Sequence, residues 1–96
     1  MKTAFVTGAS RGIGRSIALN LSSEFAIAVG YTNSQHEAEG VVEEIKKNGS
    51  NAFSVQLDIG DKESVNNAFL LIEKQLSNVD ILINNAGITK DNILPR

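Results

Sequence analysis

The chain has 96 residues, of which 42% are hydrophobic and 21% are charged. This length allows one hydrophobic core, because domains cluster at about 100–150 residues, and the composition is that of an ordinary soluble globular protein. Nine Lys and Arg residues against eleven Asp and Glu residues give a net charge of −2. Because the charges are scattered, the chain offers no basic face to nucleic acid or to an anionic membrane.

The chain has no cysteine, and His36 is its single histidine. We therefore expect neither a disulfide framework nor a metal site. No apolar run approaches the roughly 20 residues of a membrane span, and the first residues lack the pattern of a signal peptide. These observations predict a cytoplasmic protein whose first strand begins at the start of the chain.

The first half of the chain contains two strand–helix units. Residues 2–7 form a short apolar strand, residues 8–12 a glycine-rich turn, and residues 13–21 carry an apolar stripe at helical spacing. Residues 26–29 are a second apolar strand. The next helix has apolar side chains at i, i+3, i+4 and i+7 from residue 38, until an Asn-Gly pair ends it.

The second half repeats this unit once more and adds a strand. Residues 52–57 alternate large apolar with small or polar side chains, which predicts an edge strand covered on one face only. Asp61 is the expected N-cap of a helix whose apolar stripe runs over residues 65–76. Residues 81–83 form a continuous apolar strand that requires cover on both faces.

Four strands alternating with three helices predict an α/β fold with a parallel sheet and right-handed crossovers. We expect the strand order 3-2-1-4, which is the N-terminal part of a Rossmann-type doubly wound sheet. Two crossover helices would cover one face and the third helix the other. The outer edge of the fourth strand would then lack a partner, and apolar surface around residues 81–83 would be left open.

The segment GASRGIG, residues 8–14, lies between the first predicted strand and the first predicted helix. Glycines there permit positive φ and close approach of a pyrophosphate, while the N–H groups at the helix start attract anionic oxygens. An isolated glycine triplet would only close a tight turn, but this context favours dinucleotide binding. A Walker A loop is excluded, because Ile13 stands at the position of its second glycine and no Gly-Lys pair occurs.

The end of the second predicted strand, residues 31–35 (YTNSQ), contains no acid. Sites for NAD usually have an Asp or Glu here that accepts hydrogen bonds from the ribose hydroxyls. Without this carboxylate nothing in the segment repels a 2′-phosphate, and Arg11, Ser10 and Asn33 supply charge and donors to hold one. We therefore predict NADP(H) rather than NAD(H). The alternative for Arg11 is a solvated loop arginine.

Residues 7–14 (TGASRGIG) and 84–87 (NNAG), with LDI at residues 57–59 between them, resemble the N-terminal signatures of the short-chain dehydrogenase/reductase family. The resemblance covers all 96 residues. The run at residues 88–94 (ITKDNIL) is similar to the 3-oxoacyl-[acyl-carrier-protein] reductases of fatty acid synthesis. Pro95 departs from that pattern, since these reductases often have methionine there.

The resemblance implies NADPH-dependent reduction of a 3-oxoacyl-[acyl-carrier-protein] to its 3-hydroxyacyl form by a homo-oligomer, a tetramer in that family. Asp58 would accept a hydrogen bond from the adenine amine or, alternatively, cap the following turn. Asn84 would tie strands together, whereas Arg15 and His36 are expected to be solvated. The expected cofactor-binding residues are Gly8, Ser10, Arg11, Gly12, Ile13, Gly14, Asn33, Asp58, Ile59, Asn85, Ala86 and Gly87.

Catalysis in this family requires a serine and a Tyr-x-x-x-Lys, in which the tyrosine protonates the substrate carbonyl. Tyr31 is the only tyrosine, and the residue four positions later is Gln35. We therefore predict no catalytic residue in the chain and interpret residues 1–96 as the N-terminal dinucleotide-binding half of one domain. By itself this half would be inactive, and marginally stable, oligomeric or prone to aggregate.

Three alternatives remain open from the sequence. Another NADP-dependent short-chain carbonyl or sugar alcohol reductase would share the same half-site, because substrate contacts lie mostly elsewhere. A non-catalytic nucleotide-binding module would use the glycine turn alone. A methyltransferase that uses S-adenosylmethionine is disfavoured by the missing acid at residues 31–35 and by Thr7, where that class prefers an acid.

Overall fold

A computed structural model describes residues 1–85 of the chain. Strands and helices alternate along these residues, and the strands form one parallel sheet in the order β3-β2-β1-β4. The predicted fold class and strand order are therefore confirmed. The elements are β1 (Thr3–Thr7), α1 (Gly12–Leu21), β2 (Ala26–Tyr31), α2 (Gln35–Lys47), β3 (Ala52–Gln56), α3 (Lys62–Gln75) and β4 (Val79–Asn84).

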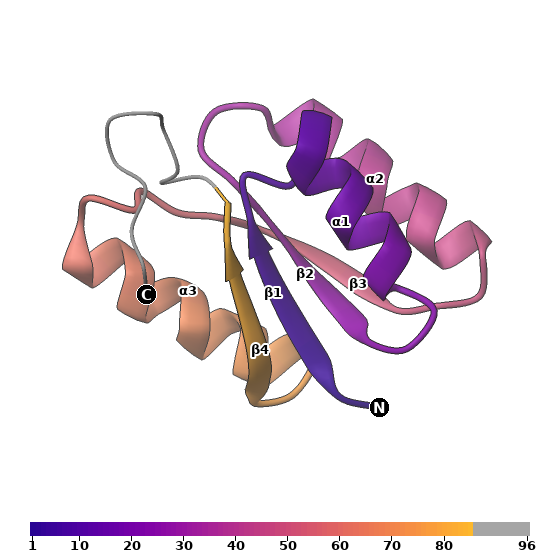
Figure 1. Ribbon diagram of the computed structural model, residues 1–96. Coiled ribbons are helices and arrows are strands. Elements are labelled where there is room, and N and C mark those ends of the chain that lie inside the picture. Colours follow the sequence, from indigo (N-terminus) through magenta and orange to yellow (C-terminus); the bar gives the residue numbers. More distant parts are fainter. Residues whose placement is uncertain (86–96) are drawn as a thin grey trace.

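Helices cover the two faces of the sheet unequally, with α1 and α2 on one side and α3 on the other (Figure 1). Successive side chains of a strand point to opposite faces, so Val6 joins the cluster beneath α1 and α2, while Phe5 joins the cluster beneath α3. The Phe5 and Phe69 rings meet edge to face, with centroids 5.4 Å apart. The sheet is thus the middle layer between two separate apolar clusters.

β3 is an edge strand, as predicted, but the prediction that only one of its faces is covered is wrong. Ala52 packs in the cluster beneath α1 and α2, whereas Phe53 and Val55 pack in the cluster beneath α3. The reason is the short connection after β3, which starts α3 against β3 before the helix crosses the sheet to β4. At the end of β3 the exposed Gln56 amide donates to the Thr32 carbonyl, just beyond β2, at 3.1 Å.

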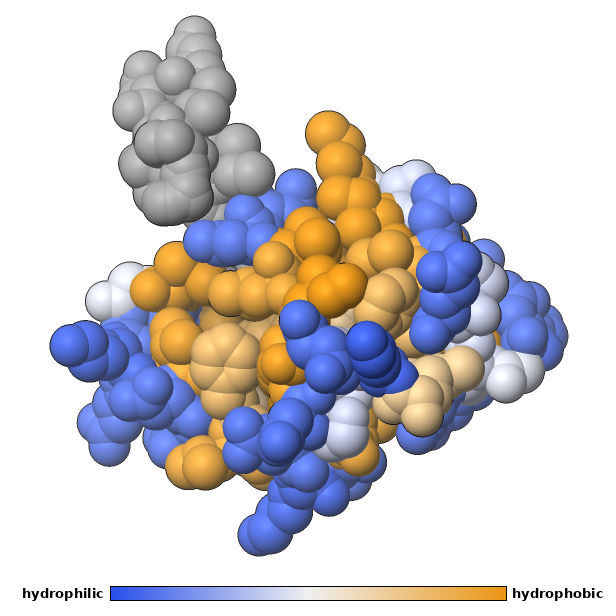
Figure 2. All heavy atoms as spheres, turned by 60° about the horizontal axis from the view of Figure 1, so that its bottom comes forward, coloured by the Kyte–Doolittle hydropathy of each residue, from blue (hydrophilic) through white to orange (hydrophobic). Residues whose placement is uncertain are grey.

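The face of β4 toward α3 is only partly covered within residues 1–85. Leu82 is 50% exposed, whereas Ile81 and Ile83 are half-buried against the cluster beneath α1 and α2. Figure 2 turns this side of the molecule forward and shows apolar side chains at its surface. The expected open apolar surface is therefore present at Leu82. None of the described helices has both the length and the apolar character needed to cross a membrane.

The start of α3 is fixed by the N-cap that the sequence predicts. The Asp61 carboxylate accepts hydrogen bonds from the backbone N–H groups of Glu63 at 3.0 Å and Ser64 at 3.5 Å. These bonds satisfy donors that have no partner inside the helix. The cap sets where α3 begins, and therefore how residues 57–61 turn at the end of β3.

We predict that Asp61→Ala lowers the free energy of unfolding of the full-length protein by about 0.5–2 kcal/mol, because the cap is lost. Asp61→Asn keeps an acceptor oxygen, so its expected loss is only a few tenths of a kcal/mol. Urea unfolding followed by circular dichroism measures both. Equal losses in the two variants would contradict the capping role and assign the effect to the charge.

Candidate functional site

The carboxyl ends of the four strands meet at one edge of the sheet, and most predicted site residues follow directly after them. Thr7 of β1 pairs with Asn84 of β4, and Tyr31 of β2 pairs with Gln56 of β3. The loop after β1 is bonded to the neighbouring strand, because the Ala9 N–H donates to the carbonyl of Gly30 in β2 at 2.9 Å. Ligands of open α/β sheets bind at this edge.

The glycine loop between β1 and α1 turns sharply at two positions. Gly8 and Gly12 both have φ of 63°, a conformation that costs other L-residues free energy. The loop is also held from β4, since the Asn85 side-chain Nδ2 donates to the Gly8 carbonyl at 3.2 Å. Asn85 therefore positions the loop, a role that the sequence did not indicate.

Gly14 lies where the first turn of α1 approaches the end of β1. A Cβ at this position would lie 2.0 Å from the Gly8 carbonyl oxygen and 2.7 Å from Nδ2 of Asn85. Both separations are too short for any side chain. Only glycine therefore allows α1 to start so close to the strand, which is the third glycine's role in dinucleotide-binding loops.

The N-terminus of α1 differs from that of α3 in lacking a side-chain acceptor. Its N-cap is Arg11, whose guanidinium has no acceptor atom, and the first turn contains no acid. The N–H groups of a helix start carry partial positive charge and attract anions. With Arg11 beside them, these donors favour a phosphate at the glycine loop.

Arg11 is 76% exposed, and its guanidinium Nη1 lies 4.0 Å from a carboxylate oxygen of Glu37, which is 48% exposed. The segment at residues 31–35 indeed lacks an acid, but Glu37 in the first turn of α2 reaches the same place. Ser-Gln-His-Glu at residues 34–37 has capping-box spacing, which indicates that Glu37 lies in the first turn of a helix but not that it faces Arg11. Asn33 lies exposed in this loop.

Arg15 is an exposed residue of α1, as expected, and it also forms an ion pair. Its guanidinium Nη2 donates to Oε1 of Glu44 at 2.6 Å, and both side chains are less than half exposed. This ion pair joins α1 to α2. The sequence did not predict this pair, because Arg15 and Glu44 are 29 residues apart. His36 is exposed at the start of α2, as expected.

Asp58 shapes the loop after β3. Its Oδ1 accepts from the Gly60 N–H at 3.0 Å, and its own N–H donates to Oγ of Ser64 at 2.9 Å. The alternative that Asp58 caps the following turn is therefore confirmed, and contact with an adenine amine stays a prediction. Ile59 beside it is 37% exposed and lines a small apolar cavity of about 210 Å³ with Leu57 and Leu82.

The predicted structural role of Asn84 is confirmed, because the Thr7 hydroxyl donates to its Oδ1 at 3.1 Å and so ties β1 to β4. Ser10 is half-buried in the glycine loop, and Ile13, in the first turn of α1, is 74% exposed. Ala86 and Gly87 lie outside the described residues, as do the run at residues 88–94 and Pro95.

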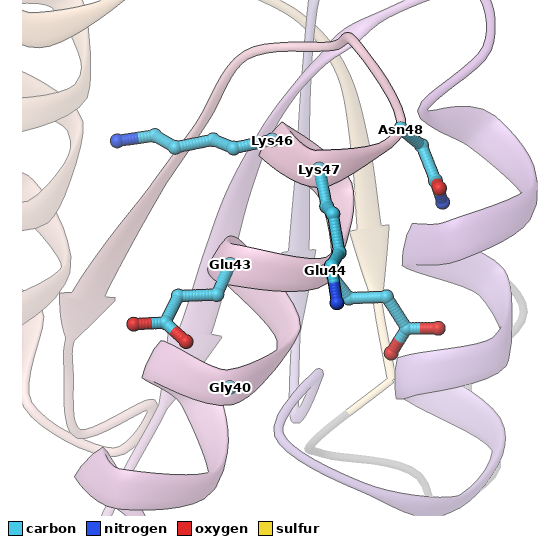
Figure 3. Close-up of a pocket in the computed structure, with 6 residues that line it drawn as sticks. All are labelled: Gly40, Glu43, Glu44, Lys46, Lys47 and Asn48. Carbon is cyan, nitrogen blue, oxygen red and sulfur yellow. The ribbon is translucent and has the colours of Figure 1, made fainter.

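A second hollow lies on the outer side of α2 and is lined by residues that include Gly40, Glu43, Lys46 and Lys47 (Figure 3). Their charged side chains point in different directions. The hollow runs from Gly40 to the C-terminal end of α2, and none of its lining residues belongs to the glycine loop. It is therefore separate from the candidate phosphate site.

The family model described as short chain dehydrogenase matches residues 2–95 of the chain. The chain belongs to this family. Among curated relatives, the 3-oxoacyl-[acyl-carrier-protein] reductase FabG of Staphylococcus aureus is 50% identical over 96 residues, which cover 99% of the chain and 39% of the relative. The chain thus spans about two fifths of the length of that relative.

Solved structures of the short-chain dehydrogenase type share the fold of this chain. A dehydrogenase/reductase from Sinorhizobium meliloti is 44% identical with a TM-score of 0.85, over 91% of this chain and 35% of the other. The landomycin C-6 ketoreductase LanV, solved with bound NADP and rabelomycin, is 37% identical with a TM-score of 0.80, over 98% and 43%.

We predict that Gly14→Ala lowers the free energy of unfolding of the full-length protein by about 1–3 kcal/mol, the usual effect of overpacking. Gly40→Ala in α2 is the matched control, because an added Cβ there meets nothing within 4 Å. The control is expected to leave stability unchanged or to raise it by about 0.4–1 kcal/mol. A Gly14→Ala protein as stable as the control would refute the close packing at Gly8.

Proposed function

We propose that residues 1–96 form the cofactor-binding half of an NADP(H)-dependent short-chain reductase. The observation that carries this proposal is the start of α1, where a glycine loop, an N-terminus without a side-chain acceptor and the exposed guanidinium of Arg11 come together. This combination suits a pyrophosphate with a second phosphate nearby. The NADP bound to the related ketoreductase supports the choice of cofactor.

Each part of this half-site has one task in the proposal. The first turn of α1, with Ser10 and Gly12 to Gly14, holds the pyrophosphate, and Arg11 with Asn33 holds the 2′-phosphate. Asp58 and Ile59 border the adenine. Asn85, Ala86 and Gly87 border the cofactor between its two ends. When bound, the cofactor supplies the hydride, and the chain's own residues bind and orient it.

The proton donor of the reaction is not among these residues in the proposal. Tyr31 is half-buried and packs against the cluster beneath α1 and α2, so its ring serves the fold. Gln35, four residues later, begins α2 and hydrogen-bonds Glu39 at 3.0 Å. The serine and the Tyr-x-x-x-Lys are expected in the part of the domain that follows residue 96.

We infer that the substrate is a 3-oxoacyl-[acyl-carrier-protein], which becomes the 3-hydroxyacyl form, and that the full-length protein is a homo-tetramer. The 50% identity to FabG of S. aureus supports this substrate. A second candidate is another NADP-dependent carbonyl reductase, supported by the likeness to a landomycin ketoreductase. A non-catalytic nucleotide-binding module is the third.

We predict that Arg11→Ala in the full-length protein weakens NADPH binding by about 1–3 kcal/mol, the contribution of a charged hydrogen bond. NADH, which has no 2′-phosphate, is expected to lose far less. Arg15→Ala removes the same charge one helical turn away, at a side chain paired with Glu44, and serves as the control. Titration calorimetry gives both affinities. Equal losses for NADPH and NADH would reject the 2′-phosphate role.

The reaction itself is tested by following NADPH oxidation in the full-length protein. We expect turnover with a 3-oxoacyl-[acyl-carrier-protein] and none with residues 1–96 alone. Turnover confined to ketones that are not linked to a carrier protein would favour the second candidate. Dinucleotide binding without any turnover would favour the module.

A further inference from the structure

Glu37 lies in the first turn of α2, with Ser34 as the N-cap of that helix. In a capping box the residue at this position reaches back to the N-cap backbone while the N-cap side chain bonds forward. Ser34, the N-cap of α2, makes no capping hydrogen bond with its side chain. The Glu37 carboxylate is instead 4.0 Å from the guanidinium of Arg11, across the gap between the two helix starts.

Within the described residues, Glu37 is the acidic residue that lies next to Arg11. The first turn of α1 has no acid, and residues 31–35 have none. Glu39 hydrogen-bonds Gln35, and Glu44 pairs with Arg15. An exposed ion pair at this separation contributes little to stability, so a stronger partner readily displaces the carboxylate from Arg11.

A 2′-phosphate held by Arg11 would meet this carboxylate as a like charge. Resting on the proposed function, we propose that Glu37 is a specificity-determining residue that lowers the preference of the protein for NADPH over NADH. It does so in two ways, by occupying Arg11 in the free protein and by repelling the bound phosphate. NADH has no charge at this position, so its affinity does not depend on Glu37.

Glu37→Gln in the full-length protein tests this proposal, because glutamine keeps the shape and the capping capacity of the side chain and removes only the charge. We expect the Kd for NADPH to fall about three- to tenfold at low ionic strength, the size of one screened surface charge. The Kd for NADH is expected to change less than about twofold by the same reasoning. The matched control is Glu39→Gln, which removes the same charge from the same helix and leaves both constants unchanged.

Two further measurements separate this mechanism from a structural one. The gain in NADPH affinity is expected to fade as salt is raised, because exposed charges are screened. In an Arg11→Ala background, Glu37→Gln is expected to gain less than in the wild type, because the competition for Arg11 is gone. An equal gain in both backgrounds overturns the proposed competition.

The failure of this inference is distinguishable from failure of the proposed function. Wild-type protein that binds neither NADPH nor NADH overturns the proposed function. Wild-type protein that binds NADPH, with the same Kd in Glu37→Gln, overturns the role of Glu37 alone. Equal tightening of NADPH and NADH also overturns it, because the effect would then not depend on the 2′-phosphate.

Discussion

The close approach of Gly14 to the carbonyl of Gly8 is the contact on which the rest of the site depends. It sets α1 directly against the end of β1, so that the helix axis points its N–H groups at the edge where the strands finish. The pairing of Thr7 with Asn84 brings Asn85 to the same carbonyl from the other side. One backbone oxygen is therefore the meeting point of a strand, a helix and a neighbouring strand end.

The starts of α1 and α3 differ in their caps. At α3 the cap is the Asp61 carboxylate, which accepts hydrogen bonds from backbone N–H groups of the first turn. At α1 the corresponding position is an arginine, which adds positive charge where the helix start is already positive. Such a start costs stability unless an anion occupies it. The local conflict between sequence and helix thus marks the site, as expected of functional positions.

The fold was largely predictable because it depends on patterns within each segment. Apolar periodicity predicted the strands and helices, and Asp61 predicted the start of α3. The cover of β3 was mispredicted because the path of α3 beneath the sheet depends on the short loop before it. The ion pairs of Arg11 and Arg15 were not predictable, because they depend on how α1 is rotated against α2. Periodicity shows which face is buried, but not which exposed charges come to lie opposite each other.

The Arg11–Glu37 and Arg15–Glu44 ion pairs both connect α1 to α2. Arg11 and Arg15 are one helical turn apart, and their partners Glu37 and Glu44 are two turns apart on α2. The nitrogen–oxygen distance is 2.6 Å in the Arg15 pair and 4.0 Å in the Arg11 pair. The apolar cluster beneath α1 and α2 packs the two helices together whatever Arg11 contacts. Arg11 is therefore able to exchange the Glu37 carboxylate for a phosphate while α1 and α2 keep their relative position.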